Sequence, residues 1–346
     1  MSSSIPFSIV DVFSTTAYKG NPLAVVNALS TSLSDTQMKL VTRQFNLSET
    51  TFVCPPTVSS AAYRLRSFLP NGIEIFGAGH NSLGALWWLA KGGHLDSITS
   101  EDGGVTLRFK QQMGQETLPV TIIKPRADNE TTSKADRAAA GLSVTLQQAA
   151  PLFYEIHSDP RGLAETLGLA DESSLGFEIA GKKVALSQVV STSSSRHLLV
   201  PVANEEVLNS ITLLDRERLA REIRVADPLA YGLYLFTARH QDDASRLPTF
   251  VTRFFSPGMS GEDPATGSAA GPLGAYLLKH GVLNIPLGEK KEVKVLQGLK
   301  MGRECLLTVT VGQGKDENSD TSIELSGGGV EVMHGTLVIP ASDTVF

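Results

Sequence analysis

The chain has 346 residues, which at roughly 150 residues per domain predicts two domains with sizeable cores. Hydrophobic residues make up 41% and charged residues 19%, a globular composition that excludes a disordered or membrane-spanning protein. Acidic residues number 36 against 30 basic ones, and the net charge is −6. Nucleic acid is therefore not an expected partner, because a duplex-binding surface needs a basic excess or basic clusters.

Two cysteines, Cys54 and Cys305, are too few and too far apart in sequence for a disulfide scaffold or a cysteine-based zinc site. The first residues contain neither a basic segment nor a long apolar stretch, so we expect no signal peptide. The longest nearly apolar run, residues 83–90, is far shorter than the about 20 residues of a membrane span. These features predict a cytoplasmic protein without a membrane partner.

The first elements in chain order are two strands separated by a polar turn. Residues 8–13 alternate in hydrophobicity, and residues 23–29 form a second apolar run. Gly20 tolerates a positive φ and Pro22 disfavours helix before it, so the turn ends there. A helix follows, with Ser34 or Asp35 as its N-cap and Met38 on its apolar side. Further strands are predicted over residues 49–54 and 63–68.

Residues 124–140 are polar, charged and poor in large apolar side chains, which is typical of a linker or a solvated loop. Many short strands and a few helices predict an α+β fold. We therefore expect an N-terminal half over residues 1–126, with residues 335–346 as a candidate returning strand. A linker over residues 127–150 and a C-terminal half over residues 151–334 complete the predicted organisation.

One long-period repeat is visible in the sequence. The pattern RxFxP occurs at Arg66 and again at Arg253, each time after a strand-like run. Each copy is followed by a glycine-rich turn and an apolar segment that ends in lysine and glycine. Strand, turn and apolar segment in the same order favour a duplication, so the two halves are expected to be pseudo-symmetric.

The two apolar segments, residues 82–90 and 269–278, are apolar nearly all the way round. Helices of that kind must be covered by other structure, so each half is expected to be a bent sheet around one central helix. Pro272 lies inside the second segment, where it removes a helical hydrogen bond. Either that helix begins late or it is kinked at Pro272.

Small residues at the start of each apolar segment suggest ligand binding. Gly79 and Gly267 allow close approach to first-turn N–H groups, which lack intrahelical partners and favour an anion such as a carboxylate or phosphate. Plain capping by Asn81, Thr266 or Ser268 is the simpler interpretation of either start alone. Two equivalent starts facing one cleft favour binding.

Three ionisable residues near these starts are acid–base candidates. Glu49 precedes an apolar strand, where it is either a solvent-facing glutamate or a functional one. His80 is either a satisfied core histidine or a neutral donor to a substrate oxygen. Asp263 precedes Pro264 and also suits an ordinary turn. Metal-spaced histidine pairs and P-loop motifs are absent, so the sequence predicts neither a metal nor a cofactor.

Four segments together resemble the PhzF-like isomerase family, which is named for phenazine biosynthesis and related to diaminopimelate epimerase. They are DVFSTTAYKGNPLAVV (residues 11–26), NLSETTFV (46–53), GAGH (77–80) and GEDPATGSAAG (261–271). The resemblance implies two similar α+β halves, each a bent, mostly antiparallel sheet or barrel around a central helix. It also implies an active site in the cleft between the halves, and a homodimer.

The resemblance also implies roles for individual residues. Glu49 is expected as the general acid/base, with His80, Asp263 and Ser268 as further catalytic residues. Substrate-binding positions are expected at the helix starts: Gly79, Asn81, Thr266 and Gly267. The thiol positions of diaminopimelate epimerase-like relatives correspond here to Ala78 and Thr266, which favours a one-carboxylate mechanism. Gly77 and Asn81 depart from the family pattern and alter the expected pocket wall.

These observations predict a cofactor-independent isomerase or epimerase that moves a proton on a small carboxylate-containing metabolite, similar to an amino or hydroxy acid. Glu49 would remove the proton and return it at another carbon or face. One alternative is a non-catalytic small-molecule binding or interaction protein that has kept the fold. Another is a racemase with other bases, which needs a second acid/base opposite Glu49.

Overall fold

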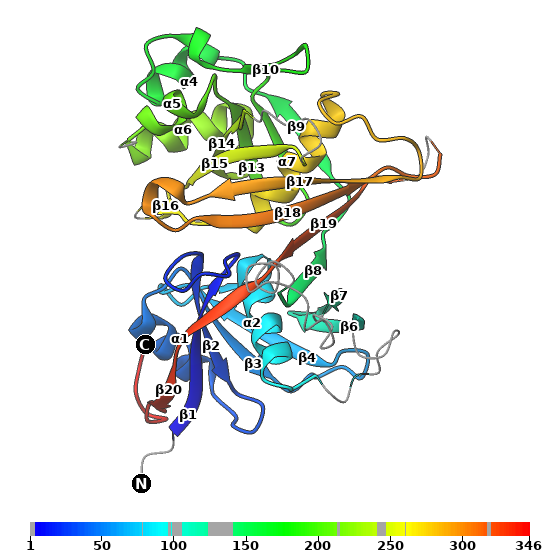
Figure 1. Ribbon diagram of the computed structural model, residues 1–346. Coiled ribbons are helices and arrows are strands. Elements are labelled where there is room, and N and C mark those ends of the chain that lie inside the picture. Colours follow the sequence, from blue (N-terminus) through cyan, green and yellow to red (C-terminus); the bar gives the residue numbers. More distant parts are fainter. Residues whose placement is uncertain are drawn as a thin grey trace. The chain divides into compact units, whose positions relative to one another are not determined.

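The computed structural model describes residues 4–77, 79–95, 98, 106–123, 141–212, 215–240, 247–259, 261–316 and 320–346. Strands outnumber helices, and the fold is a sheet-rich α+β fold (Figure 1). The chain divides into two compact units: unit 1 comprises Met1–Gln147 and Ser326–Phe346, and unit 2 comprises Gln148–Leu325. Residues 127–140 of the predicted linker lie outside the described residues.

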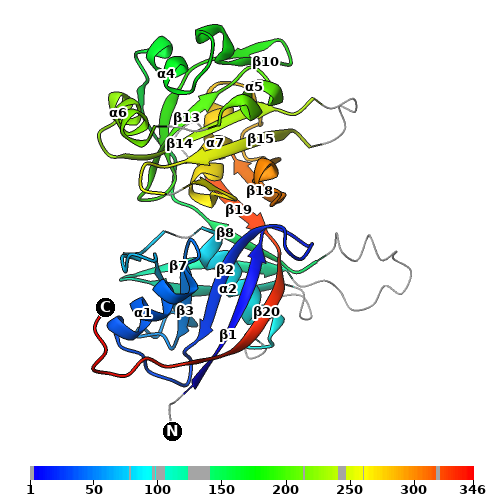
Figure 2. The same ribbon diagram turned by 90° about the vertical axis from the view of Figure 1, so that its left-hand side faces the viewer.

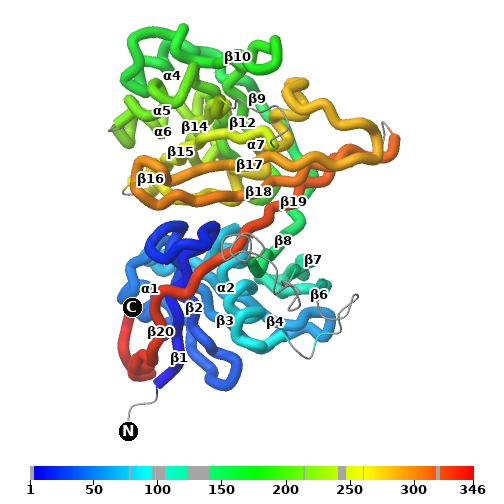
Figure 3. Tube along the Cα trace, in the orientation of Figure 1, coloured from blue at the N-terminus to red at the C-terminus, as the bar shows by residue number. Residues whose placement is uncertain are grey.

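Unit 1 is a sheet with one helix on each face. Its strands pair antiparallel (β1–β2), parallel (β2–β3), antiparallel (β3–β4 and β4–β5), parallel (β4–β6) and antiparallel (β6–β7, β7–β8). The last strand, β20, returns to pair with β1, as the red and blue segments of Figures 2 and 3 show. The elements are β1 (Ser4–Val12), β2 (Asn21–Asn27), α1 (Asp35–Phe45), β3 (Thr50–Cys54), β4 (Tyr63–Phe68), β5 (Glu74–Ile75), α2 (His80–Lys91), β6 (Thr106–Met113), β7 (Glu116–Ile123), β8 (Ser143–Gln147) and β20 (Gly329–Val338).

Unit 2 shows the same succession of pairings. They are antiparallel (β12–β13), parallel (β13–β14), antiparallel (β14–β15 and β15–β16), parallel (β15–β17) and antiparallel (β17–β18). The elements are β9 (Leu152–Ile156), α4 (Pro160–Thr166), η1 (Glu172–Ser174), β10 (Phe177–Ile179), β11 (Lys182–Val184), β12 (Gln188–Ser191), β13 (Arg196–Pro201), α5 (Glu205–Ser210), α6 (Arg216–Ala226), β14 (Ala230–Ala238), β15 (Thr249–Phe255), β16 (Glu262–Asp263), α7 (Gly267–Lys279), β17 (Lys290–Gln297), η2 (Leu299–Met301), β18 (Cys305–Gly312) and β19 (Ser322–Gly327).

The two faces of each sheet carry different cores, since successive strand residues point to opposite sides. In unit 1, Phe52 of β3 packs with Met38 and Val41 of α1. The preceding residue, Thr51, faces α2, and its Oγ1 atom donates to the Asn81 carbonyl oxygen at 3.5 Å. In unit 2, the apolar core formed with α4, α5 and α6 lies on the face of β13 that carries Leu198 and Val200.

The RxF repeat forms the same kind of structure in both units. In unit 1 the Arg66 guanidinium donates to both carboxylate oxygens of Glu74, at 2.8 and 2.6 Å, and joins β4 to β5. In unit 2 Arg253 donates to Glu262 at 2.7–3.1 Å and joins β15 to β16. Each arginine also lies over the phenylalanine two residues later. These ion pairs fix the short strands that lead into α2 and α7.

Helices α2 and α7 are buried along nearly their whole length, as their apolar sequences require. A Cβ atom on Gly84 of α2 would lie only 2.5 Å from Val12 Cγ2, and one on Gly274 of α7 only 2.7 Å from Val309 Cγ1. Glycine therefore lets each helix approach its sheet closely. Helix α7 begins at Gly267 and contains Pro272, so of the two predicted alternatives the late start is wrong.

Candidate functional site

In unit 1, Glu49 and His80 form a side-chain pair. Glu49 directly precedes β3, and His80 is the first residue of α2. Their closest atoms, Glu49 Oε2 and His80 Nε2, are 3.1 Å apart. Both side chains are largely enclosed, with exposed fractions of 17% for Glu49 and 7% for His80. The imidazole of His80 therefore lies beside the Glu49 carboxyl group, within ion-pair distance.

Burial changes the acidity of Glu49. Removal from water disfavours the charged carboxylate and raises the pKa of Glu49 from 4.5 to about 8. A carboxyl group with a pKa near neutrality exists in both protonation states at physiological pH, so it can accept a proton and release it again. Strongly shifted pKa values of this kind are typical of functional sites, although structural ion pairs produce them too.

Asn81 anchors the turn before α2. Its side-chain amide donates to Ser67 Oγ at 3.0 Å, and its side-chain oxygen accepts the Gly79 N–H at 3.0 Å. Ser67 in turn lies 2.8 Å from Thr51 Oγ1 on β3, two residues after Glu49. The Asn81 amide and the Gly79 N–H thus hold the turn against the strand that carries Glu49. The neighbouring Ala78, expected at a former thiol position, lies outside the described residues.

In unit 2, the start of α7 contains a buried hydrogen-bond network. The Gln297 side chain donates to Thr266 Oγ1 at 3.0 Å, and Thr266 Oγ1 donates to Asp263 Oδ2 at 2.5 Å. The Thr266 N–H and the Tyr234 hydroxyl both donate to Gln297 Oε1. Asp263 and Thr266 are each only 7% exposed. Asp263 is thereby held as a structural acceptor at the entry to the helix.

Ser268 lies in the first turn of α7 and is paired with a histidine that the sequence analysis did not single out. His197 Nε2, from β13, is 3.0 Å from Ser268 Oγ. The His197 side chain is buried against the rings of Phe254 and Tyr231, at centroid distances of 5.2 and 6.1 Å. Burial lowers the pKa of His197 to about 3, so its imidazole is neutral at physiological pH.

The second nitrogen of His197 indicates how this pair shares its protons. Nδ1 is buried and has no hydrogen-bond partner among the described residues. A neutral imidazole carries one N–H, and burying that N–H without an acceptor is costly. The proton is therefore favoured on Nε2, which donates to Ser268 Oγ. The hydroxyl proton of Ser268 is then directed away from His197 and is available to another acceptor.

The structure thus places the predicted residues in two local groups. Glu49 and His80 are in contact in unit 1, and Asp263 and Thr266 are in contact in unit 2 beside Ser268 and the buried Gly267. His197 and Gln297 are the additions. A histidine inside the apolar run HLLV of β13 is the only sequence feature that pointed to His197, whereas Gln297 is the last residue of the mixed strand β17 and had no distinguishing pattern.

The two cysteines lie away from the predicted thiol positions at the helix starts. Cys54 lies at the end of β3 and Cys305 at the start of β18, and both are buried and form no disulfide. Within the described ranges, His, Cys, Asp and Glu side chains form no cluster of three or more that would hold a metal ion. In the same part of the chain, the helices are all too short or too polar to cross a bilayer.

Comparisons with known proteins give consistent matches over almost the whole chain. Residues 10–335 match the family model described as phenazine biosynthesis-like protein. An uncharacterised isomerase of Mesorhizobium japonicum is 30% identical, over 96% of this chain and 98% of its own. The trans-2,3-dihydro-3-hydroxyanthranilate isomerase of Pseudomonas chlororaphis is 27% identical, over 96% and 99%.

The solved structures agree at the level of the fold. The crystal structure of a PhzF-family phenazine biosynthesis protein from Bacillus anthracis has a TM-score of 0.77 and 23% identity, covering 97% of this chain and 100% of that one. Together these matches confirm the resemblance predicted from the sequence motifs and the predicted enzyme class, an isomerase.

Proposed function

The chain belongs to the phenazine biosynthesis-like protein family, and on that premise we propose that Glu49 moves a proton on a small carboxylate-containing metabolite without a cofactor. The observation that carries this proposal is the enclosed Glu49–His80 pair with its raised Glu49 pKa. One relative's name includes an anthranilate, and this supports a carboxylate among the substrate's groups.

The chemical step needs only one carboxyl group. The Glu49 carboxylate accepts a proton from a carbon next to an activating group, and the C–H electron pair moves into a new double bond or enolate. The Glu49 carboxyl exchanges this proton with solvent and then gives a proton to another carbon, which shifts the double bond, or to the other face, which epimerises the centre. A pKa of about 8 suits both halves of this cycle, since neither protonation state is too stable.

His80 has a positioning role in this proposal. Its Nε2 atom, 3.1 Å from Glu49 Oε2, fixes the rotation of the carboxyl group so that the other carboxyl oxygen, Oε1, can face the substrate. The Asn81 contacts to Gly79 and Ser67 keep the α2 turn in register with β3. This arrangement limits the motion that the carboxyl group must make before each proton transfer.

Unit 2 carries its own hydrogen-bond donors for an anion. The Ser268 hydroxyl, relieved of donating to His197, is available to a carboxylate, together with first-turn N–H groups of α7 that begin at Gly267. Asp263 and Thr266 keep this turn rigid through Gln297. Fixed donors of this kind stabilise negative charge.

The proposal includes an origin by duplication, with two pseudo-symmetric halves. The equal succession of strand pairings supports it, and so do the matching ion pairs Arg66–Glu74 and Arg253–Glu262. Under this interpretation the starts of α2 and α7 are copies of one ancestral anion-binding turn. Only the α2 start then acquired a neighbouring residue that carries a proton, Glu49.

Hydrogen exchange in D₂O tests the proposal. The purified protein is incubated with a panel of amino acids, hydroxy acids and cyclic dihydroanthranilates, and deuterium in substrate and product is followed by NMR. We expect exchange with at least one member of the panel, reduced by about 10²- to 10⁴-fold in Glu49→Gln. The exposed Glu116→Gln is the matched control and keeps full exchange.

Exchange that survives undiminished in Glu49→Gln would remove Glu49 from the mechanism and favour a racemase with other bases. Binding of a carboxylate with no exchange in the wild-type protein would instead identify a non-catalytic binding protein. Both outcomes contradict the proposal, and circular dichroism of each variant shows whether the fold is retained.

A further inference from the structure

A polar cavity lies in unit 1 on the face of the sheet covered by α1, opposite the face that carries α2. Its volume is about 330 Å³, within the usual range of small-molecule sites. The cavity has an apolar floor, a loop that carries hydroxyl groups and a wall that carries two arginines. These surfaces come from the β2–α1 connection, α1, β3 with the residue after it, and β4. The lining residues are Ala28, Leu29, Ser30, Thr31, Ser32, Leu33, Met38, Cys54, Pro55, Arg64 and Arg66.

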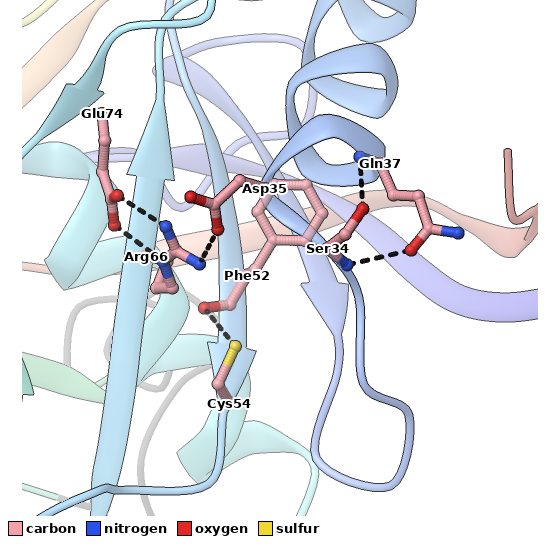
Figure 4. Close-up of polar contacts among 7 residues, drawn as sticks. All are labelled: Ser34, Asp35, Gln37, Phe52, Cys54, Arg66 and Glu74. Carbon is pink, nitrogen blue, oxygen red and sulfur yellow. Dashed lines mark hydrogen bonds and ion pairs between the residues drawn. The ribbon is translucent and has the colours of Figure 1, made fainter. Parts of the chain in front are cut away.

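Strand register explains why two arginines share this wall. In the antiparallel β3–β4 pair, Cys54 lies opposite Arg64 and Phe52 lies opposite Arg66. Side chains two residues apart on a strand share a face, so both arginines project to the same side as Cys54. Figure 4 shows Arg66 on this face, with Cys54 on the neighbouring strand.

The charge of Arg66 is already compensated. Its guanidinium donates to both Glu74 carboxylate oxygens and, at 2.7 Å, to Asp35 Oδ1 at the start of α1 (Figure 4). These bonds lock Arg66 to β5 and to the helix start. Arg66 therefore shapes the cavity wall and is not the group that still needs a partner.

Arg64 differs from Arg66 in this respect. Its Nε atom is buried and has no hydrogen-bond partner among the described residues, and the same residues offer the guanidinium no carboxylate within ion-pair distance. A buried donor without an acceptor destabilises the folded state, and more so when the group is charged. The nearby thiol does not supply the missing anion, because burial raises the pKa of Cys54.

We propose that this cavity binds a small organic anion, whose carboxylate or phosphate accepts from Arg64 and from the hydroxyls of Ser30, Thr31 and Ser32. The apolar body of the ligand rests on Leu33, Met38 and Pro55, which line the floor beside Cys54. A guanidinium suits a planar or tetrahedral oxyanion, since its N–H groups bond two oxygens at once. This site is separate from Glu49 and does not depend on the proposed isomerase activity.

Met38 provides a reporter inside the cavity. The full-length protein is labelled with ¹³C-methyl methionine, and the Met38 signal is assigned with Met38→Leu. Three probes are titrated: benzoate, the neutral benzyl alcohol of similar size, and inorganic phosphate. We expect benzoate to shift the Met38 methyl signal saturably, and both other probes to bind at least about tenfold more weakly.

Two variants locate the anion. Arg64→Gln weakens benzoate binding at Met38 by about tenfold or more, since it removes a charged hydrogen bond. Arg64→Lys keeps the charge but lacks the buried Nε donor, so it also binds more weakly than wild type. Arg108→Gln, an exposed arginine of β6 outside this cavity, is the matched control and leaves binding unchanged.

Several results would overturn this proposal: no saturable Met38 shift with benzoate, equal binding to Arg64→Gln, or equal binding of benzyl alcohol. Equal binding of phosphate and benzoate would also contradict it, because the apolar floor would then have no part. Unchanged signals of the other methionines show that each variant is folded. Glu49→Gln retains this binding even if the isomerase proposal fails, so the two proposals are tested independently.

Discussion

Helices α2 and α7 begin at corresponding places in their units, each after a short strand fixed by an arginine–glutamate pair, yet their first turns carry different chemistry. The α2 turn holds His80 against Glu49, whose pKa burial raises to about 8. The α7 turn holds Asp263 and Thr266 in a closed network, and Ser268 beside a neutral histidine.

The two turns therefore suit different chemical tasks, although each follows the same kind of short strand. A proton carrier needs a carboxyl group whose two protonation states have similar free energies, and incomplete solvation of Glu49 provides this. A set of oriented donors needs the opposite, namely groups whose protonation does not change and whose positions are fixed. Disturbing either turn should therefore produce a distinct kind of defect.

The largest expected effect concerns the rigidity of the α7 turn. Arg253 and Glu262 are 5% and 9% exposed, and Arg253 also donates to the carbonyl oxygens of Leu208 and Ile211. Arg253→Met leaves Glu262 as an unpaired buried charge and should lower the free energy of unfolding by about 3–5 kcal/mol, measured by urea denaturation. Arg66→Met should cost less, because Asp35, one of its two partners, is 68% exposed. Equal losses would contradict this ranking.

The next effect concerns Glu49 itself and depends on pH. Because its folded pKa lies above 4.5, ionisation of Glu49 destabilises the folded state, and its contribution to stability is lost as pH rises from about 4.5 to about 8. The free energy of unfolding of Glu49→Gln, relative to that of the wild-type protein, should therefore increase as pH rises through this window. The increase is up to about 1.4 kcal/mol per pH unit. Thermal unfolding at pH 5 and pH 8 measures the difference, with Glu116→Gln as control. A gain independent of pH would contradict the raised pKa.

A smaller expected effect is that the His197 imidazole does not titrate near neutral pH, unlike the imidazole of an exposed histidine. With its pKa lowered to about 3, the imidazole should show no titration between pH 8 and pH 5, and ¹⁵N shifts should place its proton on Nε2. Its depressed pKa means that the wild-type protein loses stability as pH falls from about 6.5 toward 3. His197→Gln should remove this acid-dependent loss. Titration near pH 6.5, or a proton on Nδ1, would contradict the arrangement inferred for Ser268.

Much of the local structure could be predicted from sequence, because it depends on residues close in the chain. Strand β4 has the predicted bounds, and Ser34, one of the two predicted N-caps of α1, forms a capping box with Gln37 (Figure 4). The burial of α2 and α7 followed from their apolar sequences. Their first turns begin two residues earlier than predicted, which places His80 and Ser268 inside the helices.

The pairing of side chains distant in sequence could not be predicted in the same way. His197 and Ser268 are 71 residues apart and meet only because β13 and α7 pack together. Gln297, 31 residues after Thr266, likewise joins its network through the fold alone. The raised pKa of Glu49 depends on burial, which a residue at the start of an apolar strand does not reveal.

The most direct test of the account is the titration of the Glu49 carboxyl group in the intact protein. With ¹³C-labelled glutamate, the Glu49 carboxyl signal is assigned by its loss in Glu49→Gln and followed from pH 4 to pH 10. We expect a midpoint near 8. A midpoint near 4.5, the ordinary value for an exposed glutamate, would show that Glu49 is a simple carboxylate and would contradict its role as the proton carrier.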